Sequence, residues 1–146
     1  MVRLSLGYPG HDEELALLKR KQGSNLLDLV ESVVSHDELV QMCDDVDKVH
    51  VEPEILNYIV TLINKTRNHP DLLLGASPRA TIALASISKA AAYLQGRDYV
   101  LPNDIAPLFV DTLAHRLVLR PGAENEGITA TKVLNNILNS VKSLKI

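Results

Sequence analysis

Apolar residues recur three and four positions apart over most of this chain, which is the spacing of helices that bury one face. The longest such run follows Ser77 and Pro78, a preferred N-cap residue and a proline suited to the first helical position, and it closes before Gly96. Its expected inward residues are Ala80, Ala83, Leu84, Ile87, Ala90, Ala91 and Leu94. The helix expected over 53–67 has a broad apolar face of Ile55, Leu56, Ile59, Val60, Leu62 and Ile63. The whole pattern predicts an all-α chain, with helices over residues 12–21, 35–42, 53–67, 78–94, 102–106, 107–117 and 129–143.

Local signals set several of these boundaries. Ser35 and Glu38 have the spacing of a capping box, in which each residue satisfies a backbone N–H of the other. Pro107 would cost about 3 kcal/mol in a helix interior, so we predict a break between Ala106 and Pro107. Residues 22–34 read as an irregular connection. The apolar side chains expected to be buried in the first part of the chain are Leu15 and Leu18, with Leu26, Leu27, Leu29, Val33 and Val34 as possible anchors.

The N-terminus has a different pattern. Val2 to Leu6 alternates apolar and polar residues, which predicts a short strand, and Gly7-Tyr8-Pro9-Gly10 then forms a turn or hinge signal. Nothing else in the chain resembles a partner for this strand. A lone strand cannot satisfy its backbone groups, so we interpret it as an orphan that belongs to a sheet outside this chain.

Composition narrows the class of protein. Hydrophobic residues make up 46% of the 146 residues and aromatic residues only 3%, which favours packed helices. The net charge of -3 provides no basic field for nucleic acid or for an anionic membrane. No apolar run reaches the length of a membrane span, and the N-terminus lacks a signal-peptide core, so we expect a cytoplasmic protein. The single cysteine, Cys43, fits a reducing compartment.

Arg79 is the residue that departs from local rules. A cation in the first turn of a helix opposes the helix dipole, and Asp or Glu would be favoured there. A helix N-terminus suits phosphate, however, and arginine adds a planar fork for phosphate oxygens. On these grounds alone, phosphate contact and a solvated surface arginine both stay open. No phosphate-binding glycine loop is present, and the five histidines are too scattered to predict a metal site.

Four runs in fixed order resemble a known family. They are Thr66-Arg67-Asn68-His69-Pro70, Gly75-Ala76-Ser77-Pro78-Arg79-Ala80, Gly96-Arg97-Asp98-Tyr99-Val100 and His115-Arg116-Leu117. Together they resemble the C-terminal lid of MoxR-type AAA+ ATPases, and the resemblance covers nearly the whole chain. One departure is Leu101, where a capping Thr or Ser would be expected before Pro102.

The resemblance assigns roles to a few residues. It implies that Arg79 is the sensor 2 arginine, which reaches the γ-phosphate of ATP and so takes part in catalysis. It also implies that Pro78 lies at the nucleotide, and that Tyr8 and Pro9 belong to the hinge near the adenine. No metal ligand is implied in this chain, because Mg²⁺ would be held by the core domain.

The same resemblance implies a domain organisation and partners. Residues 1–10 would be the remnant of the last core strand plus the hinge, and residues 11–146 a helical lid, a bundle of about six helices. The Walker motifs would precede this chain, so the chain alone should neither hydrolyse ATP nor hold it tightly. Partners would be an AAA+ core, neighbouring subunits of a hexamer and a client protein that a chaperone-like ATPase remodels or matures. The alternative is a stand-alone helical interaction module with no nucleotide role.

Overall fold

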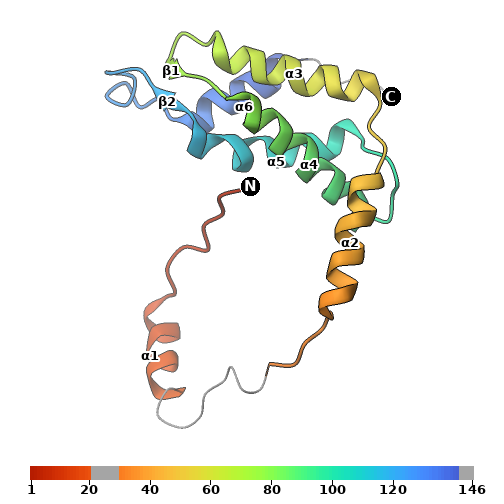
Figure 1. Cartoon of the computed structure of the whole chain (residues 1–146). Helices are drawn as coiled ribbons and strands as arrows, with labels where there is room; N and C mark the ends of the chain where they lie inside the picture. The colour runs from red at the N-terminus through yellow and green to blue at the C-terminus, as the bar shows by residue number, and fades with distance from the viewer. Residues whose placement is uncertain (21–29, 142–146) are drawn as a thin grey trace. The chain divides into compact units, whose positions relative to one another are not determined.

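The computed structural model describes residues 1–20 and 30–141 of the chain (Figure 1). These residues form two compact units, and each is described by itself. The smaller unit, Leu4–Met42, contains helix α1 (His11–Arg20) and the start of α2 (His36–Lys48). The larger unit contains Met1–Arg3 and everything from Cys43 onward.

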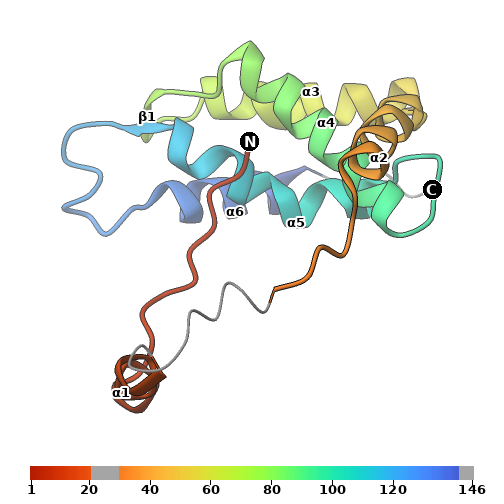
Figure 2. The ribbon, with the colours of Figure 1, turned by 60° about the horizontal axis from the view of Figure 1, so that its bottom comes forward.

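The larger unit is a helical bundle. Its helices are α3 (Pro53–Arg67), α4 (Pro78–Leu94), α5 (Pro102–Leu113) and α6 (Ala130–Ser140), with a 3-10 turn at Ala114–Arg116. Helix α4 packs against α3 and α5, and α6 closes the bundle against the same two helices. In Figure 2, α3 and α4 lie above α5 and α6. Six α-helices occur among the described residues, so the prediction of an all-α fold of about six helices is confirmed.

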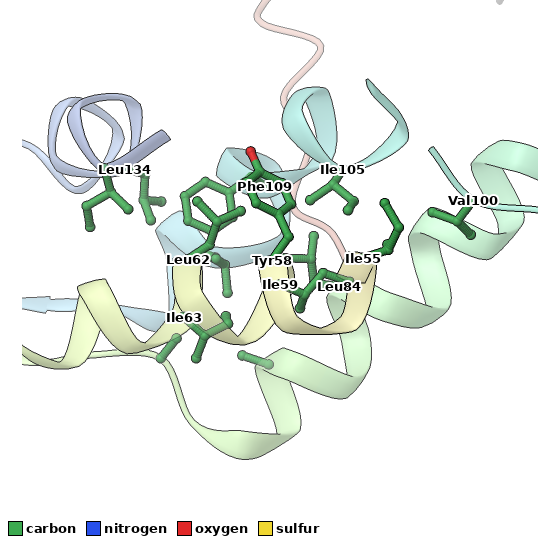
Figure 3. Packing of buried hydrophobic residues seen from close by; sticks show 14 of the residues in the cluster. Ile55, Tyr58, Ile59, Leu62, Ile63, Leu84, Val100, Ile105, Phe109 and Leu134 are labelled. Atoms are coloured by element: carbon green, nitrogen blue, oxygen red, sulfur yellow. The ribbon is translucent and has the colours of Figure 1, made fainter. Parts of the chain in front are cut away.

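The core lies between these helices (Figure 3). Ile55, Ile59, Leu62 and Ile63 form the buried face of α3, and the other helices contribute Leu84, Ile105, Phe109 and Leu134. Branched aliphatic side chains at helical spacing fill such a core to crystal-like density, and burying each contributes about 1.5–3 kcal/mol. The periodicity therefore identified most of this core. It overestimated the width of the α3 and α4 faces, since Leu56, Val60 and Leu94 are 45%, 43% and 83% exposed.

A short antiparallel pairing joins two loops of the bundle. Strand β1 (Leu72–Leu74) pairs with β2 (Val118–Leu119), and Arg120 N–H donates to the Asp71 carbonyl at 2.9 Å. This ribbon was not predicted, because strands of two and three residues have no detectable period. The ribbon ties the α3–α4 connection to the segment that follows α5.

The predicted break at Pro107 is wrong. Helix α5 runs from Pro102 to Leu113 with Pro107 inside it. Pro107 and Asn103 are both exposed, so water can satisfy the Asn103 carbonyl that the proline cannot reach. Ile105 and Phe109, on either side of the proline, are fully buried, and this packing outweighs the propensity cost.

Residues 1–10, which include the predicted strand over Val2–Leu6, have no regular secondary structure in the described chain. The strand was expected to pair with a sheet outside this chain, so its assignment to a core sheet stays a prediction. The Arg3 N–H instead donates to the Asp111 carbonyl at 3.0 Å. Asp111 lies in the last turn of α5, where carbonyls have no partner within the helix, so the segment satisfies a helix end rather than a sheet.

The predicted helix near residues 12–21 is present as α1, but its expected inward residues are not buried. Leu15 and Leu18 are 43% and 66% exposed, and Val33 and Val34 are exposed as well. Each of these side chains lies in the small unit, whose helices bury no residue of the described chain. Leu26, Leu27 and Leu29 lie outside the described residues. The capping box is confirmed: Ser35 N–H donates to Glu38 Oε2 at 2.8 Å, and Glu38 N–H donates to Ser35 Oγ at 3.2 Å.

Candidate functional site

The first turn of α4 is open to ligands of negative charge. Ser77 has the extended backbone of an N-cap residue and Pro78 follows at the first helical position, as expected. The Ser77 hydroxyl makes no capping hydrogen bond, and the first turn contains no acidic residue. The N-terminal partial charge of this 17-residue helix is therefore not neutralised by its own first turn.

Arg79 lies in this turn and is exposed. Its guanidinium makes no hydrogen bond or ion pair with any other residue that the structure describes. Its neighbour in the chain, Ala80, is fully buried, so the backbone is anchored in the core while the cation faces solvent. A free, permanently charged fork on a rigid helix start can pair with two phosphate or carboxylate oxygens.

The loop before α4 is held by the end of α3. Thr66 Oγ1 accepts the Ala76 N–H at 2.9 Å, and Arg67 Nε donates to the Ala76 carbonyl at 2.8 Å. A Cβ on Gly75 would lie 2.6 Å from Arg67 Cα and 2.7 Å from Arg67 N, so only glycine allows this approach of the two backbones. The contact of Thr66, Arg67 and Gly75 could not be predicted, because nothing in the spacing of these three residues along the chain indicates that they meet.

Arg97 has a structural role that its motif does not reveal. Its guanidinium donates to both carboxylate oxygens of Asp104, at 2.9 and 2.6 Å, and also to the Tyr99 carbonyl at 2.9 Å. The same carboxylate accepts the Leu101 N–H at 2.7 Å. Asp104 thereby caps α5 from its third position, which explains why Leu101 can replace the expected Thr or Ser. Arg97 is thus an ion-pair partner inside the fold, in contrast to Arg79.

The Asp104 carboxyl is buried, with its side chain 2% exposed. Burial acts to raise its pKa, but the hydrogen bonds from Arg97 and Leu101 and the charge of Arg97 act in the opposite direction and leave the pKa below its ordinary value. Asp104 is therefore ionised at neutral pH, and its carboxylate links the segment after α4 to the start of α5.

The hinge residues are in a different unit from Arg79. Tyr8 is 98% exposed and Pro9 is exposed, and both belong to Leu4–Met42, whereas Arg79 belongs to the larger unit. Neither unit by itself brings the three residues together. Pro78, by contrast, directly precedes Arg79 in the first turn of α4.

The remaining polar side chains do not form a second centre of known chemistry. Among residues 1–20 and 30–141, no group of three or more His, Cys, Asp or Glu side chains could hold a metal ion. Cys43 is free and exposed. Within the same residues, no helix is long and apolar enough to cross a membrane.

Comparison with known proteins places this architecture in a family. The family described as "AAA lid domain" matches residues 64–137, which include the end of α3, Arg79 and the Arg97–Asp104 pair. A protein of Bacillus subtilis named YeaC, itself uncharacterised, is 39% identical over 97% of this chain and 44% of its own length. The protein named "Chaperone MoxR1" of Mycobacterium tuberculosis is 27% identical over 97% of this chain and 39% of its own.

A solved structure agrees with the sequence relatives. The crystal structure of a protein from Cytophaga hutchinsonii, described as a candidate ATPase, superimposes with a TM-score of 0.85 at 32% identity and covers 99% of this chain and 47% of that one. The chain thus spans less than half the length of these three relatives. The chain belongs to the AAA lid domain family, and its relatives include proteins named MoxR.

Proposed function

We propose that this chain is the lid of a MoxR-type AAA+ ATPase and that Arg79 is its sensor 2 residue, which contacts the γ-phosphate of ATP bound to the AAA+ core. The observation that carries the proposal is the free guanidinium of Arg79 in the uncapped first turn of α4. A cation that opposes its own helix dipole lowers the stability of the helix. A residue present in spite of that cost indicates a functional role, here the binding of an anionic ligand. The family match supports ATP as the proposed ligand, because AAA+ cores bind ATP.

Arg79 would contribute positive charge at the place where negative charge develops during phosphoryl transfer. Two parallel N–H groups of the guanidinium can hold two oxygens of the γ-phosphate, and the positive end of the helix dipole adds to the favourable field. ATP and Mg²⁺ would be bound by the core, and the chain alone should not hydrolyse ATP. Pro78 would set the direction of the helix start, and Tyr8 and Pro9 would lie near the adenine.

The proposal extends to partners. The lid would close on its own core and transmit the nucleotide state to neighbouring subunits, in a hexamer that remodels or matures a client protein. The name of the Mycobacterium relative, a chaperone, is in keeping with such a role. A stand-alone interaction module is not favoured, since the family match covers the segment that carries Arg79.

The test compares Arg79→Ala and Arg79→Lys in an ATPase in which this chain is joined to an AAA+ core. Arg79→Ala should lower steady-state turnover roughly 10- to 1000-fold, because the lost contact is strongest in the transition state. Arg79→Lys should restore only part of the rate, since an ammonium group cannot reproduce the planar fork. Thermal melting of the same proteins should show that Arg79→Ala folds as well as the wild type or slightly better.

A matched control is available in the same chain. Arg20 is an exposed arginine in the last turn of α1, and Arg20→Ala removes the same charge from the other unit, which does not contain α4. Turnover should be unchanged in that variant. Wild-type turnover in Arg79→Ala, or an equal loss in Arg20→Ala, would exclude a specific sensor role for Arg79.

A further inference from the structure

The position of Arg79 depends on the backbone of Ala76, three residues earlier. Ala76 is 2% exposed, and side chains from the last turn of α3 engage both of its backbone polar groups. Between Ala76 and Arg79 stand an extended Ser77 and Pro78, whose ring restricts φ to about -65°. Few dihedral angles can therefore vary between the anchored residue and the cation.

The anchor is specific to the end of α3. Thr66 is fully buried, and its hydroxyl both accepts the Ala76 N–H and donates to the Ile63 carbonyl at 2.7 Å, so its orientation is set by its own helix. Arg67 is held in turn, because its Nη1 donates to Asn64 Oδ1 at 3.1 Å while Nε donates to Ala76. The absence of a side chain at Gly75 allows the two backbones to approach closely enough for both bonds.

We propose that Thr66 and Arg67 are positioning residues that hold Ala76 and thereby aim Arg79 at its ligand. This inference rests on the proposed function of Arg79 and adds to it the two side chains that set the cation's place. Charge stabilisation in a transition state depends on geometry, and a displacement of about 1 Å can cost up to 100-fold in rate. Arg67 acts through Arg79 and is not itself a ligand of the nucleotide.

A double-mutant cycle separates positioning from other roles. In the ATPase that contains the core, Arg67→Gln should lower turnover roughly 3- to 30-fold and change the KM for ATP much less. In a chain that already carries Arg79→Ala, the same substitution should change turnover by less than about 2-fold, since nothing remains to be aimed. The variant should fold, because Arg67 is exposed and α3 ends there.

Arg116→Gln is the matched control. Arg116 also donates Nε to a backbone carbonyl, that of Thr112 at 3.0 Å, and Nη2 to the Met1 carbonyl, and neither hydrogen bond reaches the loop before α4. Its substitution should leave turnover unchanged in both backgrounds.

As a second probe of the anchor, Thr66→Ser retains the hydroxyl and should retain turnover, whereas Thr66→Val removes the hydroxyl and should show the same coupling to Arg79 as Arg67→Gln.

The outcomes distinguish this inference from the proposed function. If Arg79→Ala lowers turnover but Arg67→Gln does not, the positioning role is wrong and the sensor role stands. If Arg67→Gln lowers turnover equally with and without Arg79, Arg67 acts independently and the positioning role is again wrong. If Arg79→Ala has no effect, the proposed function is wrong.

A measurement on the 146-residue chain alone decides whether the anchor orders the helix start. Backbone ¹⁵N relaxation should give order parameters of about 0.85 at Ala76 and Arg79 in the wild type and about 0.7 or lower in Arg67→Gln. Unchanged order parameters would overturn the positioning role, whatever the result for Arg79→Ala.

Discussion

Two buried threonines allow the Thr66–Ala76 hydrogen bond to be tested by the same substitution at two sites. Thr66 and Thr112 are both 0% exposed and both lie in helices, α3 and α5. The Thr66 hydroxyl holds the Ala76 N–H, whereas the Thr112 hydroxyl has no hydrogen-bond partner in the described part of the chain. Replacing threonine by valine keeps the shape of the side chain and removes only the hydroxyl, so changes in helix propensity cancel between the two sites.

The two substitutions should change the free energy of unfolding differently. Thr66→Val leaves the buried Ala76 N–H without an acceptor, which should lower the free energy of unfolding by about 1–3 kcal/mol. Thr112→Val removes a buried hydroxyl that pairs with nothing, so it should be neutral or should raise the free energy of unfolding by up to about 2 kcal/mol. For a chain of this size, 1 kcal/mol corresponds to a shift of about 3 °C in the melting temperature.

The assay is urea unfolding followed by circular dichroism at the helical band, with the three proteins measured side by side. The slope of unfolding free energy against urea should be the same in all three, so that differences in midpoint report stability. Thr66→Ser should lie close to the wild type, because the hydroxyl is retained. A Thr66→Val variant no less stable than Thr112→Val would show that the Thr66–Ala76 hydrogen bond does not stabilise the fold.

The Arg97–Asp104 ion pair and the N-terminal segment provide two further tests. Asp104→Asn should lower the free energy of unfolding at neutral pH by about 2 kcal/mol, because it leaves a charge inside the fold without its partner. The pKa of Asp104 is lowered in the folded chain, so its contribution is complete above about pH 5, declines as the pH falls past the ordinary value of about 3.9 and is lost below the folded pKa. The wild-type curve should therefore fall more steeply with acid than that of Asp104→Asn in urea titrations, and parallel curves would contradict the ion-pair account. Among the described residues, deleting residues 1–6 removes the local hydrogen bond from Gly7 N–H to Ser5 Oγ and two bonds to the larger unit's helices, from Arg3 N–H to Asp111 and from Arg116 to Met1. The melting temperature should therefore change by less than about 5 °C, and a larger fall would show that the segment belongs to the fold.

Local sequence determined the helices and several of their ends. The apolar period over Ile55, Ile59, Leu62 and Ile63 predicted α3 and its buried face, and the Ser35–Glu38 spacing predicted a capping box that the structure contains. These signals act within one or two turns of helix, where each residue meets others only three or four positions away. The unusual place of Arg79 could be detected for the same reason, since the dipole that it opposes belongs to its own helix.

Tertiary structure decided what joins residues distant in the chain. Pro107 continues a helix because Ile105 and Phe109 are buried by other elements, and this benefit is not visible in the local propensity. The β1–β2 pairing brings together residues more than forty positions apart, and strands this short have no pattern of their own. The hydrogen bonds of Thr66 and Arg67 with Ala76 depend on two chain segments that meet at Gly75. Whether Arg79 forms an ion pair depends on which carboxylates lie near it in the folded chain. Such contacts are set by the packing of the helices against one another, and a single sequence does not contain that distance information.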